Sequence, residues 1–203
     1  MMHATDRKAA MLLMTPMRDA RISGPALRTA HHEVGSYLAR EFVVHMIGVE
    51  TYSIPHVQGN DTQGFRLLNE AQTLIVALMR GGEPMALGVS AVFPLASFLH
   101  AKVPKTITKE HLNGMKAIIL LDSVNTGGSV VEFIQFVRAA DNNIRIVVVA
   151  GVIQASSISK FKKEVREGPD NLSLAAFRIS HNEFKGQGGT DTGNRLFNTT
   201  YMD

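Results

Sequence analysis

An apolar run that ends in an acidic residue and passes into a glycine-rich loop lies in the middle of the chain. Residues 117–129 read Ala-Ile-Ile-Leu-Leu-Asp-Ser-Val-Asn-Thr-Gly-Gly-Ser, and an apolar helical pattern begins directly after them. Five consecutive apolar residues are typical of a strand that is buried within a parallel sheet. The sequence therefore predicts a buried strand, a short polar loop and the N-terminus of a helix.

This unit is suited to binding a sugar phosphate. A loop at a helix N-terminus presents backbone N–H groups and the positive end of the helix dipole to an anion. The Asp122 carboxylate stands just before that loop, where it suits a ligand with vicinal hydroxyl groups. A ligand that carries both hydroxyls and a phosphate is the one we expect, and ribose 5-phosphate fits that description.

Short apolar runs alternate with helical patterns along the rest of the chain. A helix is predicted to start at Ser23-Gly24-Pro25, because proline is favoured in the first helical turn. Extended chain with a turn near residues 59–61 follows. Strands are predicted at 74–79, 116–121, 144–150 and 172–177, with helices after residue 82 and at 129–140 and 156–167. This order predicts an α/β fold with a mostly parallel central sheet and helices on both faces.

Ligands of such sheets bind at the carboxyl ends of the strands. Three predicted loops lie there: residues 80–82, residues 122–129 and the tail after Phe177. The chain has no linker-like segment, so we expect one domain over residues 1–203. Within it, residues 1–48 form an N-terminal helical segment and residues 178–203 a C-terminal loop and tail.

Composition excludes several classes of function. The net charge is only +3 and aromatic residues make up 6% of the chain, so nucleic-acid binding is not expected. Cysteine is absent, which excludes disulfides and thiolate metal sites. No apolar run is long enough to span a membrane and nothing indicates secretion, so we expect a cytoplasmic protein without membrane contact.

Familiar catalytic motifs are missing from the sequence. It contains neither a Gly-x-x-x-x-Gly-Lys-Ser/Thr loop nor a Gly-x-Gly-x-x-Gly loop after a strand. His31-His32-Glu33 lacks a second histidine four residues after His32, so it is not a zinc-protease helix. We expect these histidines on a solvated helix face.

The three loops together resemble a known family. The Asp-x-x-x-Thr-Gly-Gly-Ser pattern at residues 122–129 is similar to the phosphoribosyl pyrophosphate (PRPP) motif of type I phosphoribosyltransferases. Arg-Gly-Gly-Glu-Pro-Met at residues 80–85 resembles the pyrophosphate loop of the uracil phosphoribosyltransferase branch. The tail, residues 188–199, reads Gly-Gly-Thr-Asp-Thr-Gly-Asn-Arg-Leu-Phe-Asn-Thr and resembles the C-terminal signature of that branch. The resemblance covers nearly the whole chain in the right order, with a weaker echo at Met17-Arg18-Asp19 and Leu27-Arg28.

The resemblance implies roles for individual residues. Arg80, Asp122 and Asp191 would be catalytic: Arg80 would hold the pyrophosphate, Asp122 the ribose hydroxyls, and Asp191 would help to place PRPP. The PRPP and phosphate site would comprise Arg80, Gly81, Asp122, Ser123, Asn125, Thr126, Gly127, Gly128 and Ser129. The base would be bound mainly by main-chain groups of Gly188, Gly189, Thr190 and Asp191.

The same resemblance implies cofactors and partners. Mg²⁺ would bind mainly through PRPP oxygens and water, so no direct protein ligand is expected for it. The expected products are UMP and pyrophosphate, from PRPP and uracil or a related base. Relatives are usually homodimers, and similar domains are found fused to uridine-kinase-like domains, so a fused or separate partner of that kind is a further expectation.

Departures from the family pattern leave a second function open. Only Ser123-Val124-Asn125 separates Asp122 from the Thr-Gly-Gly sequence, one residue fewer than is usual. The segment between the Met85 helix and the strand at residue 116 is short, with only Lys102, Lys105 and Lys109 to replace a long basic arm. Residues 184–188 also lack the usual proline before the base loop. The alternative is a catalytically silent relative that binds a nucleotide or phosphate for regulation or assembly.

Overall fold

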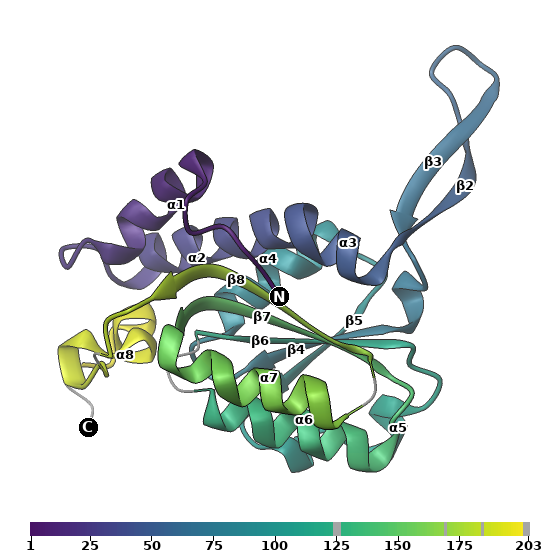
Figure 1. The fold of residues 1–203 in the computed structure, drawn as a ribbon. Helices are drawn as coiled ribbons and strands as arrows, with labels where there is room; N and C mark the ends of the chain where they lie inside the picture. Colours follow the sequence, from purple (N-terminus) through teal and green to yellow (C-terminus); the bar gives the residue numbers. More distant parts are fainter. Residues whose placement is uncertain (124–126, 169, 184, 201–203) are drawn as a thin grey trace.

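A parallel six-stranded sheet forms the centre of the molecule (Figure 1). The computed structural model describes residues 1–123, 127–168, 170–183 and 185–200. The strands follow the order β1-β8-β7-β6-β4-β5, and every neighbouring pair is parallel. Their bounds are Met2–His3 (β1), Thr73–Leu78 (β4), Ser97–Ala101 (β5), Ala117–Asp122 (β6), Arg145–Gln154 (β7) and Leu172–Ser180 (β8).

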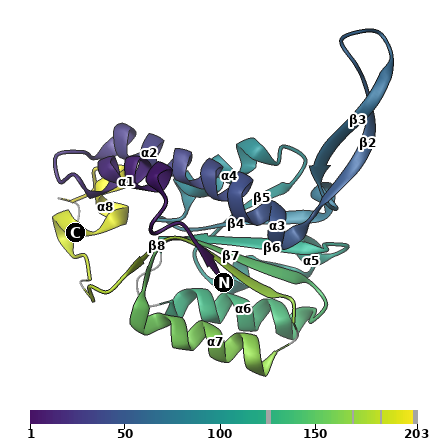
Figure 2. The same ribbon diagram turned by 45° about the horizontal axis from the view of Figure 1, so that its top comes forward.

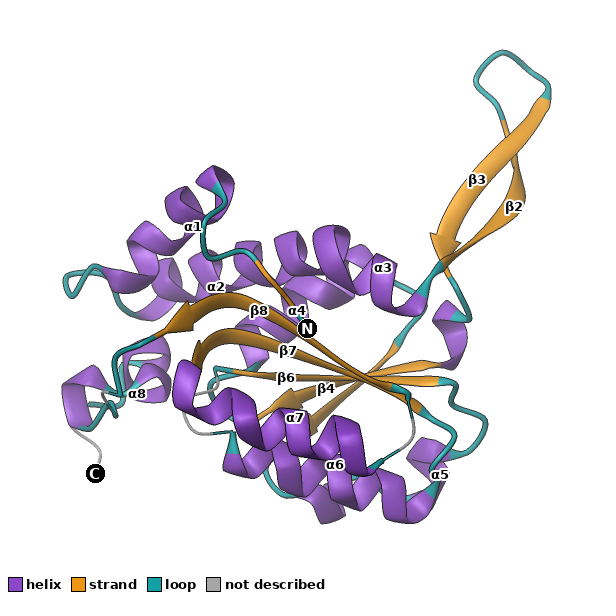
Figure 3. Cartoon of the chain, viewed as in Figure 1, coloured by secondary structure: helices purple, strands orange, loops and turns teal. Residues whose placement is uncertain are grey.

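Helices cover both faces of this sheet, as the alternating pattern predicts (Figure 3). One face carries α1 (Lys8–Arg18), α2 (Gly24–Leu38), α3 (Val44–Ile47) and α4 (Glu83–Val92). The other face carries α5 (Lys109–Leu112), α6 (Gly128–Ala140) and α7 (Ile158–Glu167). Each face has its own apolar core, because the side chains of a strand point alternately to the two sides of the sheet. The predicted α/β fold with a parallel central sheet is confirmed.

The central strands are buried because they are apolar on both sides. All residues of β4 are buried, as are the first five of β6. The apolar runs of the sequence also locate β7 and β8, but both strands continue past the ends of their predicted runs. Their pairing continues through Val152 opposite Arg178 and Gln154 opposite Ser180. Polar side chains are thereby placed on regular strands at the carboxyl edge of the sheet.

The segment from residue 24 to residue 67 leaves the sheet and returns. Helix α2 begins with Pro25 in its first turn, as predicted, and continues through a π-helical segment, Ala39–Val43, into α3. An antiparallel hairpin of β2 (Val49–Pro55) and β3 (Asp61–Leu67) follows, with its turn where the sequence predicts one. The hairpin projects away from the body of the molecule (Figure 2).

The stretch between α4 and β6 contains a strand that the sequence analysis missed. β5 forms the edge of the sheet beside β4, and its side chains are mostly half-buried or exposed, so it lacks a continuous apolar run. A short 3-10 turn at Pro104–Thr106 and α5 complete this fully described stretch. The chain here forms no long projecting arm, and Lys102, Lys105 and Lys109 are all exposed.

The C-terminal tail crosses the carboxyl edge of the sheet. It contains a 3-10 turn, Gly188–Thr190, and the short helix α8 (Thr192–Phe197), which lie beyond the arrowheads of β7 and β8 (Figure 1). No helix within the described residues is both long and apolar enough to cross a membrane.

Candidate functional site

The loops after β4 and β6 lie against each other at the carboxyl edge of the sheet. A Cβ atom on Gly81 would be 2.3 Å from the Ser123 hydroxyl oxygen and 3.9 Å from Oδ1 of Asp122. Only glycine allows this approach, because a real Cβ atom cannot lie so close to another atom. The first two predicted elements of the site therefore meet through Gly81 and Ser123.

Asp122 ends β6 as a half-buried residue beside Gly81. Burial raises the pKa of the Asp122 carboxyl to about 6, and a hydrogen bond from the Ser123 backbone N–H offsets part of this shift. A carboxyl group with such a pKa is mainly ionised at pH 7 and above. It is then able to accept hydrogen bonds from ribose hydroxyls, as the sequence predicts.

The glycine pair of the predicted phosphate loop begins α6. Gly127 is the N-cap residue in a left-handed conformation, with φ of 72°, and a Cβ atom there would be 2.7 Å from the Phe161 ring. Gly128 is the first helical residue, and a Cβ atom added to it would meet no atom of the described residues within 4 Å. Ser129 follows in the first turn and is exposed. Asn125 and Thr126 lie outside the described residues.

Arg80 contacts the C-terminal tail. Its guanidinium group donates to Oδ1 of Asn194 at 2.8 Å and to Oγ1 of Thr199 at 3.0 Å. The Thr199 hydroxyl in turn donates to Oδ1 of Asn194 at 2.9 Å. The residue predicted to hold pyrophosphate thus connects the loop after β4 to the tail that was predicted to hold the base.

The predicted base loop is held in shape by local hydrogen bonds. Asp191 caps α8, since its Oδ1 accepts the backbone N–H of Asn194 at 2.9 Å. The Thr190 side chain and the backbone of Gln187 close the preceding turn. Asp191 therefore has a structural contact in addition to the PRPP-placing role predicted for it.

Arginines anchor this tail to the N-terminal helices. Arg195 donates to the carbonyl oxygens of Met17, Asp19 and Ile22 at 2.8–3.2 Å. Arg28 of α2 donates to the Leu196 carbonyl at 2.8 Å and lies over the Phe197 ring. Among the described residues, no ion pair joins Arg195 to Asp191, so Arg195 positions the tail through main-chain contacts.

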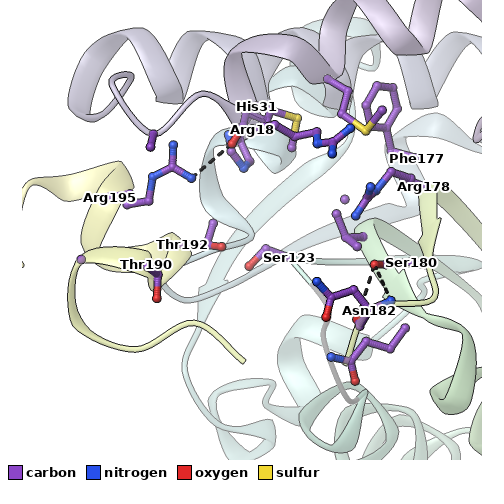
Figure 4. Close-up of a pocket in the computed structure, with 17 residues that line it drawn as sticks. Arg18, His31, Ser123, Phe177, Arg178, Ser180, Asn182, Thr190, Thr192 and Arg195 are labelled. Carbon is purple, nitrogen blue, oxygen red and sulfur yellow. Dashed lines mark hydrogen bonds between the residues drawn. The ribbon is translucent and has the colours of Figure 1, made fainter. Parts of the chain in front are cut away.

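A cavity of about 400 Å³ lies between the tail, the N-terminal helices and the ends of β6, β7 and β8 (Figure 4). Three residues of the predicted site line it: Ser123, Gly189 and Thr190. The cavity thus joins the loop after β6 to the predicted base loop. The remaining lining residues are Met14, Met17, Arg18, Ala20, His31, Gly151, Val152, Gln154, Phe177, Arg178, Ser180, Asn182, Thr192 and Arg195.

Arg18 and Arg178 were not singled out as site residues from the sequence. Arg18 ends α1 and Arg178 lies near the end of β8, 160 positions apart along the chain by their residue numbers. Arg178 belongs to no motif, and Arg18 belongs only to the weak N-terminal match at Met17-Arg18-Asp19, to which no role was assigned. The sequence offered one signal for Arg178: it directly follows the predicted strand at residues 172–177, where ligands of parallel sheets bind.

The expectation that the histidine pair lies on a solvated helix face is wrong for His31. His31 is 3% exposed and lines the cavity, because it shares the inner face of α2 with Leu27, Val34 and Leu38. Nδ1 lies 2.9 Å from the Leu27 carbonyl oxygen, which can only accept, so Nδ1 carries the proton. Burial lowers the pKa of His31, which leaves a neutral ring with Nε2 as an acceptor.

The described part of the chain contains no group of three or more His, Asp or Glu side chains arranged to hold a metal ion. Asp122 and Asp191 are the carboxylates of the predicted site. The Mg²⁺ stays a prediction, in which the ion binds mainly through PRPP oxygens and water.

Comparison with known proteins gives a family and a fold. The sequence model of the uracil phosphoribosyltransferase family matches residues 4–199. Among solved structures, "Structure of AQ2163 protein from Aquifex aeolicus" superposes with a TM-score of 0.74 at 16% sequence identity, and covers 97% of this chain and 98% of that one. No curated protein matches the sequence. Because the family match extends over nearly the whole chain, the protein belongs to the uracil phosphoribosyltransferase family.

Proposed function

We propose that the protein transfers the 5-phosphoribosyl group of PRPP to uracil or a related pyrimidine base. The observation that carries this proposal is the meeting of three loops at one edge of the sheet. Gly81 lies against Ser123, Arg80 is bonded to Asn194, and Ser123 and Gly189 line one cavity. PRPP and a base that were bound by these loops would therefore lie next to each other.

In the proposed reaction, a ring nitrogen of the base forms a bond to the anomeric carbon of the ribose. The bond from that carbon to pyrophosphate breaks, pyrophosphate leaves with the electron pair, and the ring proton passes to solvent. Such a displacement needs positioned reactants and stabilisation of the departing charge. Asp122 would orient the ribose hydroxyls, the backbone at Gly127 and Gly128 would hold the 5-phosphate, and Arg80 would approach the pyrophosphate. Mg²⁺, carried by PRPP, would neutralise part of the pyrophosphate charge.

One structural feature favours the alternative function. The stretch between α4 and β6 forms an edge strand and two short turns of helix, with no arm to cover a bound PRPP. Closure of an active site excludes water and completes its electrostatics, so its loss would reduce turnover more than binding. The second candidate is therefore a catalytically silent domain that binds a nucleotide or phosphate for regulation or assembly.

A homodimer also belongs to this proposal. The β2–β3 hairpin projects from the body and exposes Val49 and Phe65 on one face, with 66% of Phe65 accessible, and Tyr52 on the other face. Clusters of exposed apolar side chains are typical of protein interfaces. We propose that this hairpin contacts a second copy of the chain. A cytoplasmic location and a fused or separate uridine-kinase-like partner stay predictions from the family resemblance.

An assay of pyrophosphate release from PRPP tests the proposed function. Uracil, other pyrimidines and purines are each added with Mg²⁺, and Arg80→Ala is compared with Arg66→Ala, which removes an arginine from the distant hairpin. We expect release with at least one pyrimidine, loss of release in Arg80→Ala, and full release in Arg66→Ala. Binding of UMP without release for any base would select the silent alternative. Failure to bind PRPP and UMP would reject both functions.

A further inference from the structure

Two arginines without an acidic partner share one side of the cavity. Figure 4 shows the side chains of Arg18 and Arg178 beside Phe177, on the side away from Arg195. Neither arginine forms an ion pair with a described residue. The buried Nε of Arg178 also has no hydrogen-bond partner among the described residues.

The two charges lie close enough to affect each other. Burial and the neighbouring positive charge of Arg18 lower the pKa of the Arg178 guanidinium. Two cations in proximity are stabilised when an anion binds between them. Arg195 differs from this pair, because three main-chain carbonyl oxygens already accept its hydrogen bonds.

No acidic side chain of the described residues balances these charges from within the cavity. Among the lining residues that the structure describes, none is Asp or Glu. Asp19, next to Arg18 in the sequence, is engaged by Nε and NH2 of Arg21 at 3.0 and 2.7 Å. The counter-charge therefore has to come with the ligand.

The rest of the cavity suits a planar ring rather than a bare anion. Met17, Val152 and Phe177 supply apolar surface, and Gly189 and Thr190 bring in the main chain of the predicted base loop. Buried His31 adds an acceptor nitrogen. An apolar surface with a few polar groups fits a heterocycle, and the paired guanidinium groups match the fork of a carboxylate.

We propose that the acceptor base of this protein is a pyrimidine that bears a carboxylate, which binds between Arg18 and Arg178. The proposal rests on the proposed function for the role of this base as the ribosyl acceptor. It differs in the charge of the substrate, since uracil is neutral and leaves both arginines unpaired. The carboxylate takes no part in the chemistry, and it is unchanged in the product.

Titration calorimetry with free bases and nucleotides tests this assignment. The probes are uracil, uracil-6-carboxylate, UMP and the 6-carboxylate of UMP, with inorganic pyrophosphate as a separate anion. We expect each carboxylated compound to bind at least about tenfold more tightly than its neutral partner, since a charge-assisted contact exceeds about 1.4 kcal/mol. Arg178→Gln and Arg18→Gln should remove most of this advantage, so that each variant binds a carboxylated compound and its neutral partner with affinities within about twofold of each other.

Two controls separate charge from structure. Arg178→Lys retains the positive charge and should recover part of the advantage, whereas Arg66→Gln makes the same change of net charge on the distant hairpin and should have no effect. Equal affinity of wild type for carboxylated and neutral compounds would overturn the carboxylate proposal. The proposal would also be overturned if Arg178→Gln lowered the affinity for pyrophosphate but not the affinity for the carboxylated base. The two arginines would then bind the leaving group.

Pyrophosphate release from PRPP distinguishes this proposal from the function on which it rests. Release with uracil and none with its carboxylate would uphold the transfer and overturn the assigned base. The protein could instead bind the carboxylated base more tightly in a way that depends on the arginines, yet release no pyrophosphate with any base. That result would support the proposed ligand and reject phosphoribosyl transfer. Release that prefers the carboxylated base and loses this preference in Arg178→Gln would support both.

Discussion

The guanidinium group of Arg80 donates a 2.8 Å hydrogen bond to the side-chain oxygen of Asn194, 114 positions later in the chain. This bond joins the loop after β4 to the tail that carries the predicted base loop. Asn194 also accepts a hydrogen bond from the Thr199 hydroxyl, and its backbone N–H donates to the Asp191 carboxylate. The position of Arg80 therefore depends on the fold of the tail. In this family member, the proposed leaving-group and base sites are therefore mechanically connected.

Arg80 and Asn194 are expected to be energetically coupled. Arg80→Ala and Asn194→Ala should each lower the free energy of unfolding by about 1–3 kcal/mol, because each removes a charge-assisted hydrogen bond between the loop after β4 and the tail. The double variant should lose less than the sum, with a coupling energy of about 0.5–3 kcal/mol. Urea unfolding of the four proteins measures it. Strict additivity would show that the contact contributes nothing to the tail's position.

Asp122 should make stability depend on pH. The pKa of this carboxyl is raised from 3.8 to about 6 in the folded protein, so the native state binds more protons than the unfolded state between these pH values. Stability from this group is therefore complete below about pH 4 and lost as pH rises through about 6, by at most about 3 kcal/mol. Asp122→Asn should remove this loss and be more stable than wild type at pH 7.5, but not at pH 4.5. Urea unfolding at several pH values checks the trend.

The same substitution should weaken ligand binding. Asn lacks the negative charge that strengthens hydrogen bonds from ribose hydroxyls, and such bonds contribute roughly 1.5–3 kcal/mol. Calorimetric titration of Asp122→Asn with UMP or PRPP should give an affinity at least about tenfold lower than that of wild type. If Asp122→Asn is more stable than wild type at pH 7.5 but binds UMP or PRPP more weakly, the Asp122 carboxylate serves ligand binding and not stability. Unchanged affinity would remove Asp122 from ribose binding.

The neighbouring glycines Gly127 and Gly128 should respond differently to a side chain. Gly127→Ala places a Cβ atom against Phe161 in a left-handed backbone, so it should destabilise the protein by about 1–3 kcal/mol. Gly128→Val enters open space, so its melting temperature should stay close to that of wild type. The added side chain would, however, occupy the place of a 5-phosphate. If Gly128→Val keeps the full rise of melting temperature with UMP, the phosphate binds elsewhere.

The hairpin should control the oligomeric state. Phe65→Asp puts a charge on the exposed apolar surface of β3 and should shift a homodimer to monomer, because an unpaired buried charge destabilises an interface. Sedimentation velocity at micromolar concentration measures the shift. Thr62→Asp, also on β3 and on the face opposite to Phe65, is the matched control and should leave the dimer intact. A wild-type monomer would contradict the proposed dimer directly.

The sequence alone determined the layered fold and the order of its main elements. The apolar runs that became β4 and β6 have no polar side to face water, so burial between two layers of helices was the available solution. The start of α6 at Gly127 and Gly128 was equally local, because a glycine in a left-handed conformation is a common start to a helix after a loop. Strand β5 was missed, since an edge strand is half exposed and its pattern is weak.

Tertiary structure alone decided which polar side chains share the cavity. His31 is buried there because α2 turns that face inward, a packing choice that its sequence neighbours did not reveal. Arg18 of α1 and Arg178 of β8 line the same cavity, and nothing in either local sequence encodes that they come together. Motif residues follow from local geometry, whereas the charge of a cavity depends on side chains contributed by distant segments, and these come together only in the folded chain.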